Sequence, residues 1–165
     1  MEKRGKLKSQ DIIIQSSCFD LQFRRDIRYE RPNSPTYYRW KIQFIVTTSK
    51  EHTNALSKIK KIIGCGKIHA INNQARFSVQ KIDDINKFVV PFFNKNQLHD
   101  KKKRDFALWQ RAVSIIHRNK GKSMATWGKN DLLNLLAIHK STLKYKNNPR
   151  QPKWMGNAKL MAQKS

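Results

Sequence analysis

Acidic residues are scarce in this sequence. There are 11 Asp and Glu against 35 Lys and Arg, which gives a formal net charge of +24 and an isoelectric point near 10.5. So large an excess of one sign repels itself in a compact chain unless a polyanion neutralises it. The composition therefore indicates a nucleic-acid partner in preference to a merely soluble basic protein.

Cysteine and long apolar runs are also nearly absent. Cys18 and Cys65 lack a CxxC spacing, so neither a disulfide framework nor a zinc site is expected. No run reaches the roughly 18 apolar residues of a membrane span, and MEKRGKLKSQ has no hydrophobic region behind its charges. We therefore expect no membrane partner and no secretion. Abundant Ile, Lys and Asn suit AT-rich coding, which favours a mitochondrial or other organellar matrix.

The length of 165 residues suits one domain with basic ends. Residues 18–24 alternate between apolar and polar side chains, as do residues 38–46, and both patterns are typical of half-buried strands. The Pro-containing, Arg-rich residues 26–37 between them predict an exposed hairpin loop. Trp40 falls on the inward face of the second strand, where it is expected to be core.

Helices and a second hairpin follow. Thr48 and Glu51 form a capping box for a helix of about fifteen residues that ends at Gly64. Residues 67–80 predict a hairpin that turns at Asn72 and Asn73. A short helix from Asp83 is expected to stop at Pro91, and Asp100 to cap a longer helix. A leucine-rich helix comes next, and the basic residues from 144 onward are expected to be extended or ordered only on a partner.

The predicted order is ββαββααα, an α+β fold in which helices cover one face of a four-stranded antiparallel sheet and leave the other face bare. The bare face would carry Asp20, Gln22, Arg24, Arg39, Lys41, Gln43, Lys67, His69, Arg76, Ser78 and Gln80. Arg25, Arg28 and Arg31 in the first loop would extend it. A solvent-exposed face without a binding partner normally carries both positive and negative side chains. This set is mainly basic and amide-containing, which predicts contacts with phosphates and base edges.

Several segments resemble one known family. They are GCGKI, the KIDD that follows Val79, PFF, KKKRDFALW and MATWGKNDLLNLLAIHKSTL. Together they resemble the LAGLIDADG homing endonucleases over about residues 18–143, which implies that family's saddle-shaped fold. We divide the chain into a basic segment at 1–17 with a motif helix, a binding domain at 18–145 and a basic tail at 146–165.

The motif that names the family is degenerate here. When the chain is aligned on Phe19, SQDIIIQSS occupies the positions of LAGLIDADG, and Ser16 replaces the acid that holds a divalent metal in the family. Asp11, Gln15 and Ser17 replace small residues that let two such helices pack closely. A hydroxyl is a poor ligand for a hard cation, so metal-dependent cleavage is not expected. The larger side chains block close helix approach, so dimerisation is not expected either. Too few residues precede Ser9 for an intact copy.

We therefore expect a monomeric, non-catalytic protein, without a metal or other cofactor, that binds structured RNA. The RNA would be ribosomal, among neighbouring proteins of an organellar ribosome, or part of an intron ribonucleoprotein. Lys101, Lys102, Lys103 and Trp154 join the expected RNA contacts. The alternative is an active homodimeric, Mg²⁺-dependent endonuclease that cuts duplex DNA through Asp11 or Asp20 with Lys101 and Lys102. A DNA-binding repressor is a third reading.

Overall fold

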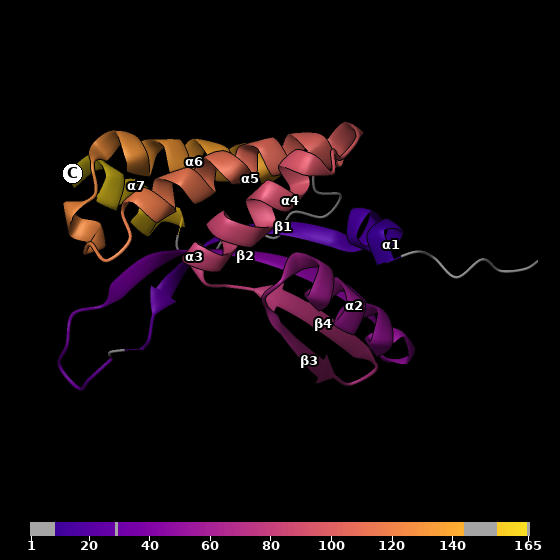
Figure 1. Cartoon of the computed structure of the whole chain (residues 1–165). Helices are drawn as coiled ribbons and strands as arrows, with labels where there is room; N and C mark the ends of the chain where they lie inside the picture. The colour runs from indigo at the N-terminus through magenta and orange to yellow at the C-terminus, as the bar shows by residue number, and fades with distance from the viewer. Residues whose placement is uncertain (1–8, 29, 144–154, 165) are drawn as a thin grey trace, which may run out of the picture. The chain divides into compact units, whose positions relative to one another are not determined.

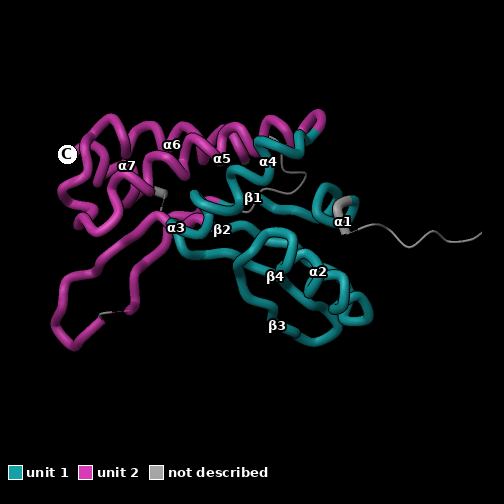
Figure 2. Tube along the Cα trace, in the orientation of Figure 1, with its two compact units in different colours: residues 1–20, 43–98 teal, residues 21–42, 99–165 magenta. Residues whose placement is uncertain are grey.

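The computed structural model describes residues 9–28, 30–143 and 155–164 (Figure 1). They fall into two compact units, one made of residues up to 20 with 43–98 and the other of 21–42 with residues from 99 onward (Figure 2). The first two strands run through both units. None of the helices in the described ranges combines the length and the apolarity that crossing a bilayer requires.

The strands form one four-stranded sheet in the order β1-β2-β4-β3. Its members are β1 (Ser17–Asp26), β2 (Tyr37–Ser49), β3 (Lys67–Ile71) and β4 (Gln74–Val79). β4 pairs antiparallel with both β2 and β3. The α+β class, the antiparallel sheet and both predicted hairpins are confirmed.

The first unit has an aromatic core against one face of the sheet. Phe44 on β2 and Phe77 on β4 are fully buried, and their ring centroids lie 6.3 Å apart. Phe93 packs edge-on against Phe44 at 5.3 Å. Leu56 and Ile59 complete this core. The helices of the unit are α1 (Ser9–Ser16), α2 (Thr53–Ile63), α3 (Ile82–Asp84) and α4 (Val90–Lys95).

The predicted capping box at Thr48 is wrong. β2 continues to Ser49, and a short 3-10 turn at Lys50–His52 precedes α2. Because Thr48 pairs with Ala75 of β4, its backbone is committed to the sheet and cannot cap a helix. The hydroxyl of Thr48 donates to the carbonyl oxygen of Ser49 at 3.2 Å. Strand pairing thus overrides the capping-box pattern of Thr48 and Glu51. As a result, α2 has 11 residues instead of about fifteen.

Pro91 does not end a helix, contrary to the sequence-based expectation. A π-helical turn at Ile85–Val89 follows α3 and leads directly into α4, with Pro91 in the first turn of α4. Proline lacks an N–H and is tolerated in a first turn, where that donor has no partner within the helix. The π-helical turn ends at Val89, so a new α-helix begins just before the proline. Phe92 and Phe93 are therefore helical.

Gly64 and Gly66 occupy positions that only glycine fits well. Gly64 ends α2 with a left-handed φ of 96° and donates its N–H to the carbonyl oxygen of Lys60. Gly66 enters β3 with a φ of 104°, and an added Cβ would lie 2.5 Å from the Phe77 ring. The GCG segment is therefore a helix stop and a strand entry, as predicted.

The described part of the second unit contains three α-helices. They are α5 (Asp100–Arg118), α6 (Lys129–Leu143) and α7 (Met155–Lys164). Trp109 on α5 is 1% exposed and Trp40 on β2 is 7% exposed, so both are core, as expected. Ala158 and Ala162 of α7 are also buried, and α7 packs on α6. The expectation of an extended tail is therefore wrong for residues 155–164. A repeating apolar spacing within those residues is enough to form a helix once α6 is beside them.

Candidate nucleic-acid interface

The first unit presents one polar face of its sheet. Thr47, Arg76 and His69 are direct cross-strand neighbours on β2, β4 and β3. Paired residues project to the same side of an antiparallel sheet, so these three side chains form a row. Arg76 and His69 are exposed. Phe77 and Val79 alternate with Arg76 and are buried on the opposite side, which explains why this row faces outward.

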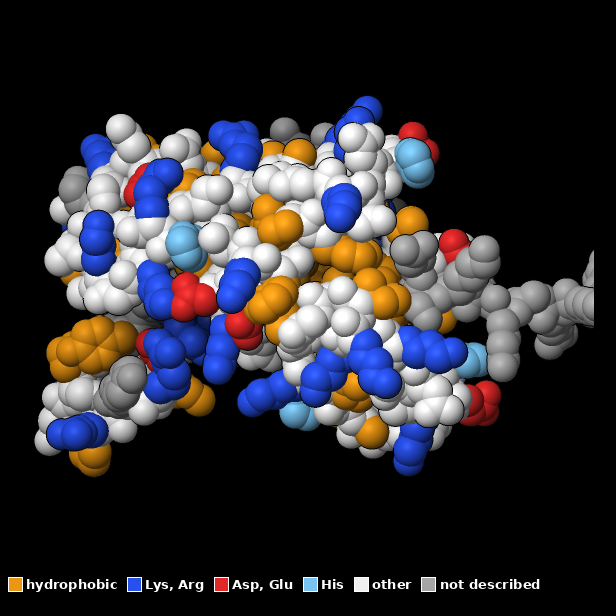
Figure 3. Space-filling model, viewed as in Figure 1, with side chains coloured by type: hydrophobic (Ala, Val, Ile, Leu, Met, Phe, Trp, Pro, Cys, Tyr) orange, Lys and Arg blue, Asp and Glu red, His pale blue; other side chains and the backbone are white. Residues whose placement is uncertain are grey.

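A neighbouring row is partly covered. Lys67 pairs with Ser78, and Ser78 pairs with Ile45 of β2. Lys67 is exposed, whereas Ser78 and Ile45 are buried. Lys and Arg side chains gather over the part of the molecule formed by α2, β4 and β3 (Figure 3). Accessible positive charge in this unit therefore lies on α2 as well as on β3 and β4.

The inner end of the same face is a buried polar pair. The Gln43 side-chain amide donates to the carboxylate of Asp20 across 2.7 Å, and both residues are 7% exposed. A carboxylate held in this way is satisfied within the protein. The predicted exposure of Asp20, Gln43 and Ser78 is wrong. The alternation of apolar and polar residues correctly placed these three side chains on this side of the sheet. It carried no information about what covers the centre of the sheet.

The other predicted contact residues lie at or near the surface. Those that are half-buried are Gln22, Arg39, Lys41 and Lys102. Those that are exposed are Arg24, Arg25, Arg28, Arg31, Lys67, His69, Arg76, Gln80, Lys101 and Lys103. Trp154 lies outside the described residues. Lys67, His69, Arg76 and Gln80 belong to the first unit, and the remaining residues of these two sets belong to the second.

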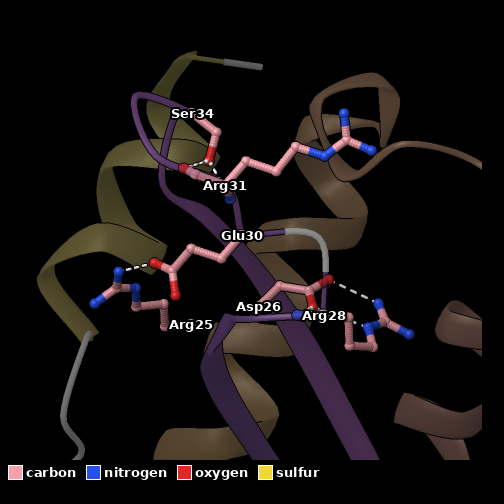
Figure 4. Close-up of polar contacts among 6 residues, drawn as sticks. All are labelled: Arg25, Asp26, Arg28, Glu30, Arg31 and Ser34. Carbon is pink, nitrogen blue, oxygen red and sulfur yellow. Dashed lines mark hydrogen bonds and ion pairs between the residues drawn. The ribbon is translucent and has the colours of Figure 1, made fainter.

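The loop between β1 and β2 is built by its own polar contacts (Figure 4). Arg28 donates from Nε and Nη2 to the two carboxylate oxygens of Asp26, at 2.8 and 2.7 Å. Arg25 forms an ion pair with Glu30. Ser34 donates to the carbonyl oxygen of Arg31 at 2.8 Å and accepts from its N–H at 3.1 Å. Two arginines of the loop thus have carboxylate partners, whereas the side chain of Arg31 extends away from both pairs.

The Asp26 pair predicts an acid-sensitive loop. The hydrogen bond from the Arg28 side chain lowers the pKa of Asp26 from 3.8 to about 2. Since the folded pKa lies below the unfolded one, the contribution of the pair is fully present above pH 3.8 and is lost as the pH falls toward 2. A carboxyl-carbon NMR titration is expected to place Asp26 well below 3.8, and the Arg28→Ala variant to return it toward that value. A wild-type Asp26 that titrates near 3.8 would contradict this loop geometry.

The residues around α1 do not fit a divalent-metal site. α1 ends at Ser16, and Asp11 lies in its first turn, about 7 Å farther along the helix axis. Asp20 already accepts a hydrogen bond from Gln43 in the sheet. In the part of the chain that the structure describes, no three His, Cys, Asp or Glu side chains gather as metal ligands would. Mg²⁺ needs closely spaced oxygen ligands, which this arrangement does not provide.

Sequence reasoning missed the residues that organise the first loop. Asp26 and Glu30 were given no role from the sequence, yet each forms an ion pair with an arginine. The available signal was local: in a chain with so few acids, two of them alternate with Arg25, Arg28 and Arg31. Such spacing allows ion pairs within one loop, but the spacing alone does not show which arginine pairs with which acid.

Comparison with known proteins supports the fold and the lineage. The family model described as LAGLIDADG endonuclease matches residues 18–113, more than half of the chain. The probable intron-encoded endonuclease 3 of Neurospora crassa is 30% identical over 93 residues, which are 55% of this chain and 17% of that protein. The chain therefore spans less than a fifth of the length of this curated relative.

Solved structures agree in fold. The homing endonuclease I-TnaI superimposes with a TM-score of 0.67 at 21% identity, covering 96% of this chain and 97% of that one. The LAGLIDADG homing endonuclease I-SmaMI, in a structure bound to cleaved DNA, gives a TM-score of 0.71 at 17% identity, covering 97% of this chain and 50% of that one. With the matched family model, these findings show that the chain belongs to the LAGLIDADG endonuclease family.

Proposed function

We propose that this protein binds nucleic acid through its strand surfaces and the first loop, and that it does not itself hydrolyse phosphodiester bonds. The observation that carries the proposal is that α1 ends at Ser16, with no carboxylate in its last turn. The exposed Arg and Lys of the interface suit contacts with backbone phosphates, which give affinity without chemistry. A binder and a nuclease share these cations, but only a nuclease also needs the metal ligands.

The two acids nearest to α1 are poor substitutes for the missing ligand. Asp20 is buried and bonded to Gln43, so metal binding there would break an existing hydrogen bond and require uncovering of the carboxylate. Asp11 is half-buried and at the far end of the helix. One isolated carboxylate holds Mg²⁺ weakly without further protein or phosphate ligands. Neither acid therefore favours the alternative of an active endonuclease.

For the partner, we propose structured RNA in an organellar ribosome or an intron ribonucleoprotein, bound by a monomer. The support is the net charge of +24, and the Neurospora relative is described as intron-encoded. Duplex DNA is the second candidate, because the solved I-SmaMI relatives are bound to DNA. An organellar matrix is the corresponding location.

A cleavage assay tests the proposal. Purified protein is expected to leave both duplex DNA and structured RNA intact with either Mg²⁺ or Mn²⁺, at concentrations where a gel shift shows that the substrate is bound. The reason is the absence of a carboxylate at the end of α1. Metal-dependent cutting that disappears in Asp20→Asn or Asp11→Asn would overturn it. Gln43→Leu is the matched control, since it breaks the Asp20 contact and keeps the carboxylate.

A further inference from the structure

The second unit contains a group of arginines with too few carboxylates. We call Arg24, Asp26, Arg28 and Arg39 the Arg39 cluster. The charges of Arg28 and Arg39 both act on Asp26, and the charge of Arg24 acts on Arg39. Asp26 is already engaged by Arg28 through two side-chain bonds and a backbone N–H at 3.2 Å. The cluster therefore holds an excess of positive charge that its own acid does not neutralise.

Arg39 is the least satisfied member of the cluster. Its side chain is half-buried on β2, and its Nε is buried with no hydrogen-bond partner in the described part of the chain. Burial lowers the pKa of Arg39, and the nearby Arg28 and Arg24 lower it further against the opposing effect of Asp26. A buried donor without an acceptor costs free energy, and a guanidinium among like charges costs more. The free protein thus holds Arg39 in an unfavourable state.

We propose that the Arg39 cluster is a specific binding site for one phosphate group, in which Arg39 is the central ligand. The inference rests on the proposed nucleic-acid function and identifies the phosphodiester as the group that this loop receives. On binding, the Arg39 side chain swings outward and donates two parallel N–H bonds to the phosphate, and Arg24 supplies a second positive charge. Asp26 retains Arg28, so the site keeps its shape while the phosphate supplies the missing negative charge.

A phosphate fits this site for a geometric reason. A guanidinium presents a planar fork that matches two oxygens of a phosphate, whereas an ammonium acts only as a point charge. A half-buried arginine also loses less solvation on binding than a fully exposed one. Arg39 should therefore contribute more to binding than an arginine of equal charge that already has an acid beside it. Arg118 of α5, which pairs with Asp131 and is not among the predicted contacts, is such an arginine.

The test compares two substitutions that conserve charge. Arg39→Lys is expected to weaken binding of duplex DNA or structured RNA roughly tenfold at fixed salt, because lysine cannot form the paired bonds. Arg118→Lys is expected to stay within about twofold of wild type, because Arg118 is paired with Asp131 and lies outside the predicted contacts. Thermal melting of both variants checks that the fold survives. Equal affinities for the two variants would overturn the specific site and leave general nucleic-acid binding intact.

A second measurement does not depend on nucleic acid. The Nε–Hε NMR resonance of Arg39 in the wild-type chain is followed during titration with inorganic phosphate, and again with chloride at matched ionic strength. A saturable shift with phosphate alone supports the site, even if the chain binds no nucleic acid and the proposed function fails. An Arg39 resonance that responds equally to both ions, or to neither, would overturn the inference. The Arg118 resonance serves as the internal control, since Arg118 is paired with Asp131.

Discussion

Raising the salt concentration from about 50 to 200 mM is expected to weaken nucleic-acid binding by about a thousandfold or more, as for proteins that make about six to ten phosphate contacts. The interface exposes enough Lys and Arg side chains for that number of contacts, and each contact would release counterions, which added salt opposes. Fluorescence anisotropy over a salt series, with duplex DNA and with structured RNA, gives both slopes. The tighter partner at matched salt decides between the two candidates.

Charge-removing variants locate this effect on the molecule. Replacing Lys67 and Arg76 with Gln on the polar face of β3 and β4 is expected to reduce the salt slope by about two. Lys58→Gln with Lys60→Gln removes the same charge from exposed positions of α2, and we expect a much smaller change. Equal slopes for the two double variants would mean that net charge alone drives binding. If the affinity of the wild-type protein did not depend on salt concentration, phosphate contacts could not be the source of binding.

Gly66→Ala is expected to destabilise the first unit by about 3 kcal/mol, from a left-handed backbone and an overpacked contact together. The added Cβ would lie 2.5 Å from the Phe77 ring and 3.0 Å from the carbonyl oxygen of Ser78. Phe77 is fully buried, so its ring cannot move aside without disturbing the aromatic core. Urea unfolding followed by circular dichroism measures the loss in free energy of unfolding.

Two other glycines separate the causes. Gly64 has a similar φ of 96°, but its nearest neighbour, the Phe88 ring, would lie 3.3 Å from an added Cβ. Gly64→Ala should therefore cost about 1–2 kcal/mol, mainly for the backbone. Gly128 has no left-handed φ and no atom within 4 Å of the added carbon, so Gly128→Ala is expected to be near neutral. A Gly66→Ala cost no greater than that of Gly64→Ala would show that the Phe77 contact is unimportant.

Much of the fold was predictable because its signals are local and strong. The alternation of Trp40, Ile42, Phe44 and Val46 identified the buried side of β2, and all four residues are buried. Gly64 marked the end of α2 for a steric reason that no tertiary contact could reverse. The spacing of Phe106, Trp109, Val113 and Ile116 likewise identified the inner side of α5.

The errors arose where a distant segment decided the outcome. Thr48 had a good capping pattern, but its partner Ala75 lies far along the chain and extends the strand. The hydrogen bond between Asp20 and Gln43 joins two strands, and alternation within either strand cannot reveal it. For the site, composition identified the basic residues, whereas the pairing of Asp26 with Arg28 beside Arg39 depends on how the loop folds back.

β3 is an edge strand, with β4 on one side only. Open strand edges invite pairing with another chain, which leads to aggregation, and lysine at the edge is a common natural protection. Lys67 is exposed on β3, so two copies that approach edge to edge would bring like charges together. The basic residues that suit a polyanion would therefore also disfavour pairing between free copies. A bound polyanion that neutralised them would remove this repulsion and leave the exposed apolar Ile71 on the open edge.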